Sequence, residues 1–167
     1  MLRKRPRKRA LAAGQAADPE AAGAAAVMLL SRRDFCASEL RCTLLGQGFE
    51  PVAVQGVIEE FSARGYLDDE RYALHFVSQR AERGQGPLRI QRELEQLGVA
   101  APLIEAALTA GEDWARRARE LRIRRFGLAP PVHWPDKAKQ ARFLQYRGFS
   151  NDHIRAALGS EVSDALS

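Results

Sequence analysis

Residues that catalysis and metal binding require are scarce in this chain of 167 residues. The two cysteines, Cys36 and Cys42, are six positions apart, which suits neither a disulfide framework nor a metal pair on one helix face. The three histidines, His75, His133 and His153, lack helical ligand spacing, and no nucleophile-and-base or phosphate-cradling glycine motif occurs. We therefore expect no catalytic residue, no metal site and no cofactor.

Long apolar runs are also missing. The longest, Ala24–Leu30, is far shorter than the roughly 20 residues that cross a bilayer, so we expect no membrane span. Aromatic residues make up only 7% of the chain, and strand-forming runs of Val, Ile and Thr are scarce. This composition favours helices over sheets. With no disulfide framework, we expect a reduced, intracellular protein.

Charge is plentiful but unevenly distributed. The net charge is +5, yet residues 1–9 hold six basic and no acidic residues, and residues 112–147 hold ten basic and four acidic residues. The remainder is net acidic, so we expect anionic partners at these two places. The Arg-rich start is similar to a transit peptide or nuclear signal, but Pro6 and contiguous charges spoil an apolar helix face. A disordered basic tail is the preferred interpretation.

The chain repeats itself with a period of fifty residues. Gly48, Gly98 and Gly148 share one register, and three apolar sets keep it: Leu44, Leu94 and Leu144; Val54, Ile104 and Ile154; Ile58, Leu108 and Leu158. Glycine adopts the left-handed conformation that ends a helix, and the apolar residue after it has the spacing of a hydrophobic staple with the next helix. Each copy is therefore predicted to contain a helix, a glycine turn and a second helix.

A third helix is expected upstream of each pair. Its apolar residues align at about 100° per residue, and Arg33, Arg80 and Arg122 end this helix in the three copies, at the centre of its apolar stripe. We interpret these arginines as structural, with stems on the core and guanidinium groups at carbonyls of neighbouring helix ends. A row facing a partner is the alternative. Asp68 is the expected N-cap of the second such helix.

The predicted fold class is all-α, with three tandem three-helix repeats. Each repeat buries too little apolar surface to stand alone, so the copies should stack into an elongated, curved body. The predicted helices span residues 22–33, 37–47, 51–64, 68–83, 87–97, 101–110, 113–126, 136–147 and 151–158. The predicted organisation is a disordered basic, Ala-rich tail (1–21), three repeats (22–66, 67–111 and 112–159) and a C-terminal tail (160–167).

An ordered set of motifs runs through the middle repeat. It comprises Gly65, Tyr66, Leu67, Asp68, Asp69, Arg71, Tyr72 and Ala73, then Arg80, Gly84, Gly86, Pro87 and Ile90, and finally Leu94 and Gly98. Related motifs lie at Ser38-Glu39-Leu40 and from Lys139 to Leu144, followed by Arg147, Gly148, Phe149 and Ser150. This combination, over about residues 24–158, resembles the RecX family of bacterial regulatory proteins.

Two departures from the family pattern qualify the resemblance. The basic N-terminal tail does not belong to the pattern, and the family's Gly-Lys-Gly turn reads Gly84-Gln85-Gly86 here. With glutamine in place of lysine, the turn can still have a backbone role, but it cannot have a role that requires a lysine charge. Tyr66 and Leu67 follow a helix end, where packing is the commoner role, although they could anchor an interface.

The resemblance implies a partner and an activity that the residues alone could not name. It implies a cytoplasmic protein without catalytic residues or cofactor that binds the RecA nucleoprotein filament and fits into its helical groove. Inhibition of strand exchange, ATP hydrolysis and coprotease activity would then modulate homologous recombination, DNA repair and the SOS response. We expect the protein to act as a monomer.

The candidate partner-binding residues are cationic. Arg89 and Arg92 resemble family positions, although Glu93 and Glu95 could pair with them. On a helical wheel Arg116, Arg117 and Arg124 point away from the apolar stripe, which suits either a solvated face or contact with an acidic groove or phosphate. The full candidate set for the RecA or DNA groove is Arg89, Arg92, Arg116, Arg117, Arg124, Lys137, Lys139 and Arg142.

Two other functional classes remain open. A helical DNA-binding protein that uses basic patches is the first, since the glycine turn resembles a helix-turn-helix. Its recognition helices at residues 51–64 and 102–110 would be acidic or nearly uncharged, so weak, salt-sensitive and nonspecific DNA binding is expected rather than base reading. The second class is a helical scaffold, which would have no effect on RecA.

Overall fold

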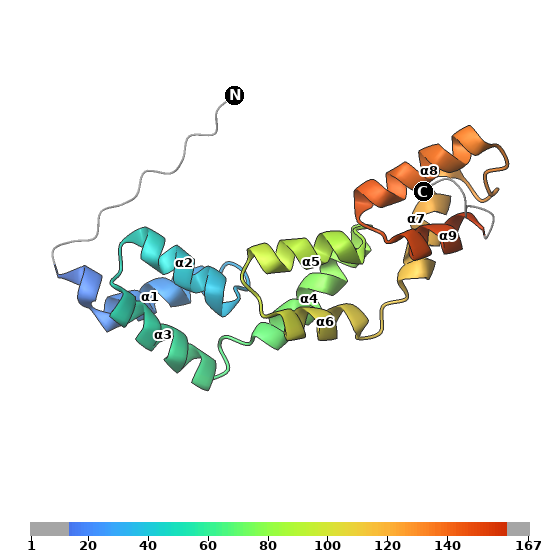
Figure 1. The fold of residues 1–167 in the computed structure, drawn as a ribbon. Helices are drawn as coiled ribbons and strands as arrows, with labels where there is room; N and C mark the ends of the chain where they lie inside the picture. The colour runs from blue at the N-terminus through green and yellow to red at the C-terminus, as the bar shows by residue number, and fades with distance from the viewer. Residues whose placement is uncertain (1–13, 160–167) are drawn as a thin grey trace, which may run out of the picture. The chain divides into compact units, whose positions relative to one another are not determined.

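The computed structural model describes residues 14–159, and all regular structure in this range is helical (Figure 1). The elements are η1 (Gln15–Ala17), α1 (Pro19–Leu30), α2 (Ala37–Gln47), α3 (Pro51–Ala63), α4 (Asp69–Glu82), α5 (Pro87–Gln96), α6 (Ala101–Thr109), α7 (Trp114–Phe126), α8 (Trp134–Arg147) and α9 (Asn151–Leu158). The prediction of an all-α chain built from three-helix repeats is confirmed. The predicted C-terminal tail and most of the predicted basic tail lie outside the described residues.

The first helix departs most from its predicted bounds of 22–33. The Asp18 side chain accepts a hydrogen bond from the Glu20 backbone N–H at 2.9 Å, and Pro19 occupies the first helical position. Residues 19–21, assigned to the tail, therefore belong to α1. The helix also ends at Leu30, so Arg33 lies beyond it rather than at its end. The other predicted bounds agree with the observed ones to within two residues.

The repeated glycines end α2, α5 and α8 as predicted. Gly48, Gly98 and Gly148 have φ angles of 107°, 80° and 93°, a left-handed conformation that favours glycine. The apolar residues of the three predicted staples are all buried: Phe49 and Val54, Val99 and Ile104, Phe149 and Ile154. The turn thus fixes how each second helix leads into the third.

The chain divides into two compact units. Within the described residues, unit 1 consists of residues 14–72 with 97–99, and unit 2 of residues 73–96 with 100–159. In unit 1, α1 and α2 both pack on α3 around a buried cluster that includes Leu40, Leu44, Val54 and Phe61. In unit 2, α5 packs on α6, and α7 packs on α9 and α8, around buried residues that include Ile90, Leu94, Leu144 and Ile154.

The start of α2 is held by polar contacts within unit 1. The Asp69 carboxylate accepts a hydrogen bond from the Ala37 backbone N–H at 2.8 Å, and the Cys36 thiol donates to the Leu97 carbonyl at 3.4 Å. Burial raises the pKa of the Cys36 thiol above its usual value. Cys36 is therefore a packing residue whose thiol is kept protonated.

In unit 2, the start of α5 is joined to the end of α8 through the backbone. The Gly86 N–H donates to the Arg147 carbonyl at 2.8 Å, and the Leu88 N–H donates to the Gly148 carbonyl at 3.0 Å. A Cβ atom on Gly86 would collide with the backbone of Gly148 and Phe149. Two helices from different repeats therefore meet here only because this position is glycine. We call this contact the glycine junction.

Candidate partner-binding surface

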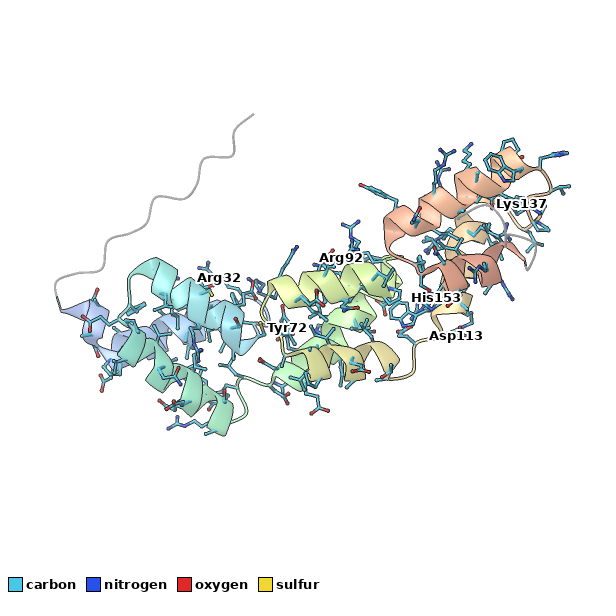
Figure 2. All side chains as sticks on the ribbon, viewed as in Figure 1. Arg32, Tyr72, Arg92, Asp113, Lys137 and His153 are labelled. Carbon is cyan, nitrogen blue, oxygen red and sulfur yellow. The ribbon has the colours of Figure 1, made fainter. Side chains whose placement is uncertain are left out.

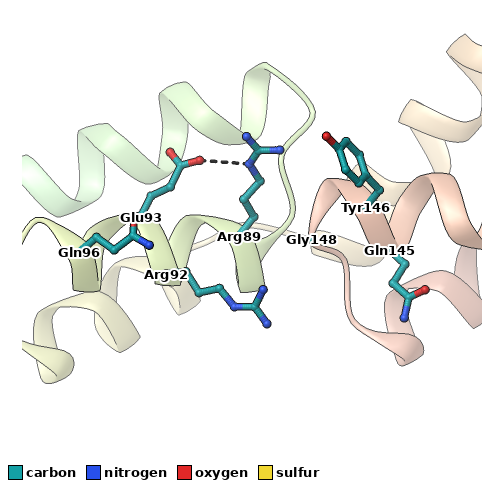
Figure 3. A pocket seen from close by; sticks show the side chains of 7 residues that line it. All are labelled: Arg89, Arg92, Glu93, Gln96, Gln145, Tyr146 and Gly148. Carbon is teal, nitrogen blue, oxygen red and sulfur yellow. Dashed lines mark hydrogen bonds and ion pairs between the residues drawn. The ribbon is translucent and has the colours of Figure 1, made fainter.

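The glycine junction brings α5 and the end of α8 together around a pocket of about 440 Å³ (Figure 3). Its lining residues are Arg89, Arg92, Glu93, Gln96, Gln145, Tyr146 and Gly148. Both candidate arginines of the middle repeat line it, at successive turns of α5. We call it the α5–α8 pocket.

The two arginines of the pocket differ in how their charge is used. Glu93 accepts from Arg89 Nε at 3.1 Å and also pairs with Arg80 Nε at 3.0 Å, so one carboxylate lies between two guanidinium groups. The expected pairing of Arg89 within its helix is thus confirmed. Arg92 is exposed and makes no hydrogen bond or ion pair within residues 14–159 (Figure 2). Its charge is available to a ligand.

The arginines of α7 are only partly free. Arg117 forms a two-point contact with Glu112, at 2.9 and 3.2 Å, and this hydrogen bonding raises the pKa of Arg117 above its usual value. Arg117 is partly buried, which corrects the expectation that it points outward like Arg116 and Arg124. Arg116 is exposed and approaches Glu120 at 3.6 Å. Arg124 is exposed and has no partner among the described residues.

The candidate cations of α8 lie along the helix that also carries Tyr146. Lys139 and Arg142 are exposed, whereas Lys137 is partly buried near the helix start (Figure 2). Arg142 Nε donates to the Ala138 carbonyl at 3.4 Å, while Lys139 has no hydrogen bond or ion pair in the described part of the chain. Arg92, Arg124 and Lys139 are thus the candidate residues that make no hydrogen bond or ion pair in residues 14–159, and all three belong to unit 2.

The family-motif residues ahead of α4 have structural roles. Leu67 is buried, which supports its packing interpretation, whereas Tyr66 is 58% exposed and meets the Phe61 ring edge-on at 5.6 Å. Asp68 accepts from the Arg71 backbone N–H at 2.9 Å, so the predicted N-cap is confirmed. Gly65, with a φ of 72°, ends the preceding turn, and Arg71 reaches its carbonyl at 3.5 Å.

The motif residues within unit 2 form its core and turns. Ala73, Ile90 and Leu94 are completely buried, while Tyr72, which ends unit 1, is partly buried. Gly84 turns the chain at a φ of 74°, and Pro87 begins α5. A Cβ atom on Gly84 would come within 2.9 Å of the Leu121 side chain and 3.7 Å of Arg124 Nη2. Arg124 therefore lies beside the turn that leads to the glycine junction.

The three equivalent arginines do not share one partner type. Arg122 is buried and donates to the Leu128 and Ala129 carbonyls at 3.2 and 3.0 Å, as its structural interpretation requires. For Arg33 the main partner is instead a carboxylate, since two contacts of 2.8 Å join it to Glu39, and Arg80 likewise pairs with Glu93. The prediction that Arg80 contacts carbonyls at a neighbouring helix end is therefore wrong, because its partner is the Glu93 carboxylate.

The sequence predicted a hinge or an exposed loop between Gly127 and Pro135, but it did not single out Tyr146 or the apolar side chains of that loop. Tyr146 is 80% exposed beside the pocket, and Leu128, Val132 and Trp134 are exposed around a proline-rich segment. A contiguous group of large exposed apolar side chains is a signal of a binding surface, whereas a single one is common on any protein. Tyr146 sits between Gln145 and Arg147 rather than on the apolar stripe of α8, and this placement could have revealed it.

Within residues 14–159, no helix is both long and apolar enough to span a bilayer. No group of three or more His, Cys, Asp or Glu side chains in the same range could hold a metal ion.

Comparison with known proteins extends over nearly the whole described chain. Residues 68–108 match the family model for the second three-helix domain of RecX, and residues 112–158 match that for its third three-helix domain. A regulatory protein RecX of Halorhodospira halophila is 44% identical over 146 residues, covering 87% of this chain and 91% of that protein. One from Xanthomonas axonopodis pv. citri is 41% identical over 140 residues, covering 83% and 86%.

The fold has solved counterparts as well. The crystal structure of RecX from Lactobacillus salivarius superimposes with a TM-score of 0.73 at 20% identity, covering 83% of this chain and 93% of that one. A second crystal structure, of a regulatory protein RecX, gives a TM-score of 0.70 at 22% identity. At these identities the likeness concerns the fold alone.

Proposed function

The chain belongs to the RecX family of regulatory proteins, and we propose that it binds the RecA nucleoprotein filament and inhibits its recombinase, ATPase and coprotease activities. It acts by binding and not by catalysis, as a monomer in the cytoplasm, and so modulates homologous recombination and the SOS response. The observation that carries this proposal is the similarity to RecX proteins over 87% of the chain.

The charges of unit 2 support a contact with an anionic partner. Arg92, Arg124 and Lys139 carry positive charge that no acidic side chain among the described residues neutralises. A filament presents DNA phosphates and protein carboxylates, and unpaired surface cations attract both. Arg116 and Arg117 contribute less, because each already has an acidic neighbour.

Sequence-specific DNA reading is less well supported. The helix that follows the glycine turn carries exposed Glu59 and Glu60 in the first repeat, and exposed Glu105 in the second. Such carboxylates would repel phosphates on entering a major groove. Weak, nonspecific attraction of DNA to the unpaired cations is compatible with the same surface and accompanies the proposed filament binding.

The test is an ATP hydrolysis assay with the RecA protein of the same organism on single-stranded DNA. Wild-type protein should lower the rate of ATP hydrolysis. The triple reversal Arg92→Glu, Arg124→Glu and Lys139→Glu should lose most of this inhibition. The loss should be larger at low salt, because charge contacts are screened over about 10 Å at 0.1 M salt. Each reversal lies on the surface and should change stability by no more than about 0.5 kcal/mol.

A matched control reverses three exposed arginines of unit 1, Arg32, Arg41 and Arg64, and so changes the net charge equally. This control should inhibit nearly as well as wild type. If wild-type protein leaves ATP hydrolysis unchanged, the proposed function is wrong. Equal loss in both triple variants would instead show that net charge, and not the unit 2 cations, governs binding.

A further inference from the structure

We infer that the α5–α8 pocket binds one nucleotide of a single-stranded nucleic acid, with the base against Tyr146 and the phosphate at Arg92. This site goes beyond the proposed function, because it concerns a ligand that the chain would bind in the absence of RecA. It rests on a cavity, an exposed ring, an unpaired charge and two amides that come together in unit 2.

The first element of the site is an exposed aromatic ring beside a guanidinium group. The Tyr146 ring is 80% exposed, and Figure 3 shows it next to the Arg89 guanidinium group above the gap between α5 and α8, while the Arg92 side chain extends below the gap. Glu93 holds Arg89 at 3.1 Å, so this guanidinium group does not have to be ordered when a ligand enters. A base could stack on the ring and meet the guanidinium group at its other face, as single-strand-binding sites do.

The second element is a charge that fits one phosphodiester. Among the lining residues, Arg89 and Arg92 are positive and Glu93 is negative, which leaves one net positive charge. Glu93 is shared by Arg89 and Arg80, whereas Arg92 has no acidic partner among the described residues. One phosphate group of a nucleic-acid strand carries the single negative charge that would balance it.

The third element is a pair of amides. Gln96 and Gln145 line the pocket at its two sides, one on each helix. An amide side chain both donates and accepts hydrogen bonds, so it can pair with the edge of any base. We therefore expect little base preference at this site.

The size and rigidity of the pocket also suit a nucleotide. A volume of about 440 Å³ lies within the usual range of small-molecule pockets, roughly 300–1,000 Å³. The backbone hydrogen bonds from Gly86 to Arg147 and from Leu88 to Gly148 fix the two helices that form it. The site is thus formed before a ligand arrives, which lowers the entropic cost of binding.

The same features favour a single strand over the alternatives. In a duplex the bases are stacked on one another, and placing one in the pocket requires its extrusion from the helix. Exposed Glu95 on α5 would also oppose the dense phosphates of a duplex lying along that helix. An acidic peptide could satisfy Arg92, but a carboxylate alone would leave the exposed Tyr146 ring without a function.

The test measures binding of the full chain to two fluorescent strands of equal length by anisotropy, one an oligothymidine and the other an abasic backbone. Wild-type protein should bind the oligothymidine more tightly. Tyr146→Ala should lose roughly 10-fold in affinity for it, the usual effect of removing one stacking contact, and should no longer distinguish the two strands. Tyr146→Phe keeps the ring and should behave as wild type.

The phosphate contact has its own readout. Arg92→Gln should weaken binding to both strands and reduce the slope of log affinity against log salt by about 0.7, the value for one phosphate contact on a single strand. Arg83→Gln is the matched control, because Arg83 is an exposed arginine of unit 2 that does not line the pocket. It should leave the salt slope closer to that of wild type.

Several results would overturn the inference. A nucleotide site would be excluded if wild-type protein bound the two strands equally or bound neither at low salt. It would also be excluded if Tyr146→Ala kept the wild-type affinity, or if Arg83→Gln and Arg92→Gln gave the same salt slope. If Tyr146→Ala loses only the inhibition of RecA, the pocket binds a protein side chain instead. Because the oligonucleotide assay contains no RecA, its outcome is separate from that of the proposed function.

Discussion

Replacement of Gly86 by alanine tests the contact on which the α5–α8 pocket depends. The φ angle of Gly86 is not among the left-handed ones, so an alanine there is not strained by its own backbone. The added Cβ would instead meet the backbone atoms of Gly148 and Phe149, which have no flexible end that could move aside. The start of α5 and the end of α8 must therefore separate.

The cost of this separation can be worked from the contacts that it breaks. The two backbone hydrogen bonds at 2.8 and 3.0 Å contribute about 0.5–1.5 kcal/mol each, and forced displacement in a packed region costs about 1–3 kcal/mol. Alanine recovers about 0.4–1 kcal/mol by restricting the unfolded chain. We expect a net loss of about 1–5 kcal/mol, which corresponds to a fall in melting temperature of roughly 2–20 °C.

The measurement is urea and thermal unfolding followed by far-ultraviolet circular dichroism. Gly46→Ala is the control, because Gly46 lies in α2 with nothing within 4 Å of an added Cβ. That substitution should raise stability by up to about 1 kcal/mol through helix propensity. Should Gly86→Ala prove as stable as wild type, the close backbone contact would not exist, and the pocket built on it would lose its basis.

Two further predictions concern single side chains of the third repeat. Arg122→Met keeps an apolar stem but removes the donors to the Leu128 and Ala129 carbonyls. The free energy of unfolding, measured by urea titration, should therefore fall by about 1–3 kcal/mol. An unchanged free energy of unfolding would refute the structural role of Arg122. Burial lowers the pKa of His153 below its ordinary 6.5, and its Nδ1 accepts the Ser150 backbone N–H at 3.4 Å. As the pH falls through about 6.5, His153 takes up a proton in the unfolded chain before it does so in the folded one, so the folded state loses stability. The melting temperature should therefore fall as the pH is lowered. In His153→Gln, whose side chain can still accept the Ser150 N–H, this fall should be smaller.

The repeat architecture could be predicted because it depends on local chemistry. A glycine after an apolar stripe both ends a helix and sets the register of the next one, so Gly48, Gly98 and Gly148 marked all three turns correctly. The start of α1 was missed because alanines on both sides of it give no apolar periodicity. Asp18 followed by Pro19 is a cap and first-turn signal that would have placed the start.

The charge pairs could be predicted only in part. A helical wheel gives the direction of a side chain but not its partner, and it contains no residue from outside the helix. Arg117 was therefore assigned to the free surface, although Glu112, which precedes α7, lies close enough to bind it at two points. The pairing of Arg80 with Glu93 joins α4 to α5 and depends on packing that a wheel does not describe.

The pocket could not be predicted, because it arises where the copies differ and not where they agree. One period before Arg89, Arg92 and Tyr146, the equivalent positions hold Glu39, Cys42 and Gln96, an acid, a thiol and an amide.

Gly86 likewise corresponds to Cys36, one period of fifty residues earlier. Gly86 brings two backbones together, whereas Cys36 contacts the Leu97 carbonyl through its side chain. The period fixes where a helix starts and ends in both copies. The second copy then supplies the cation, Arg92, and the third copy supplies the exposed ring, Tyr146, so binding of an anionic, planar ligand at this site depends on these substitutions and not on the repeat itself.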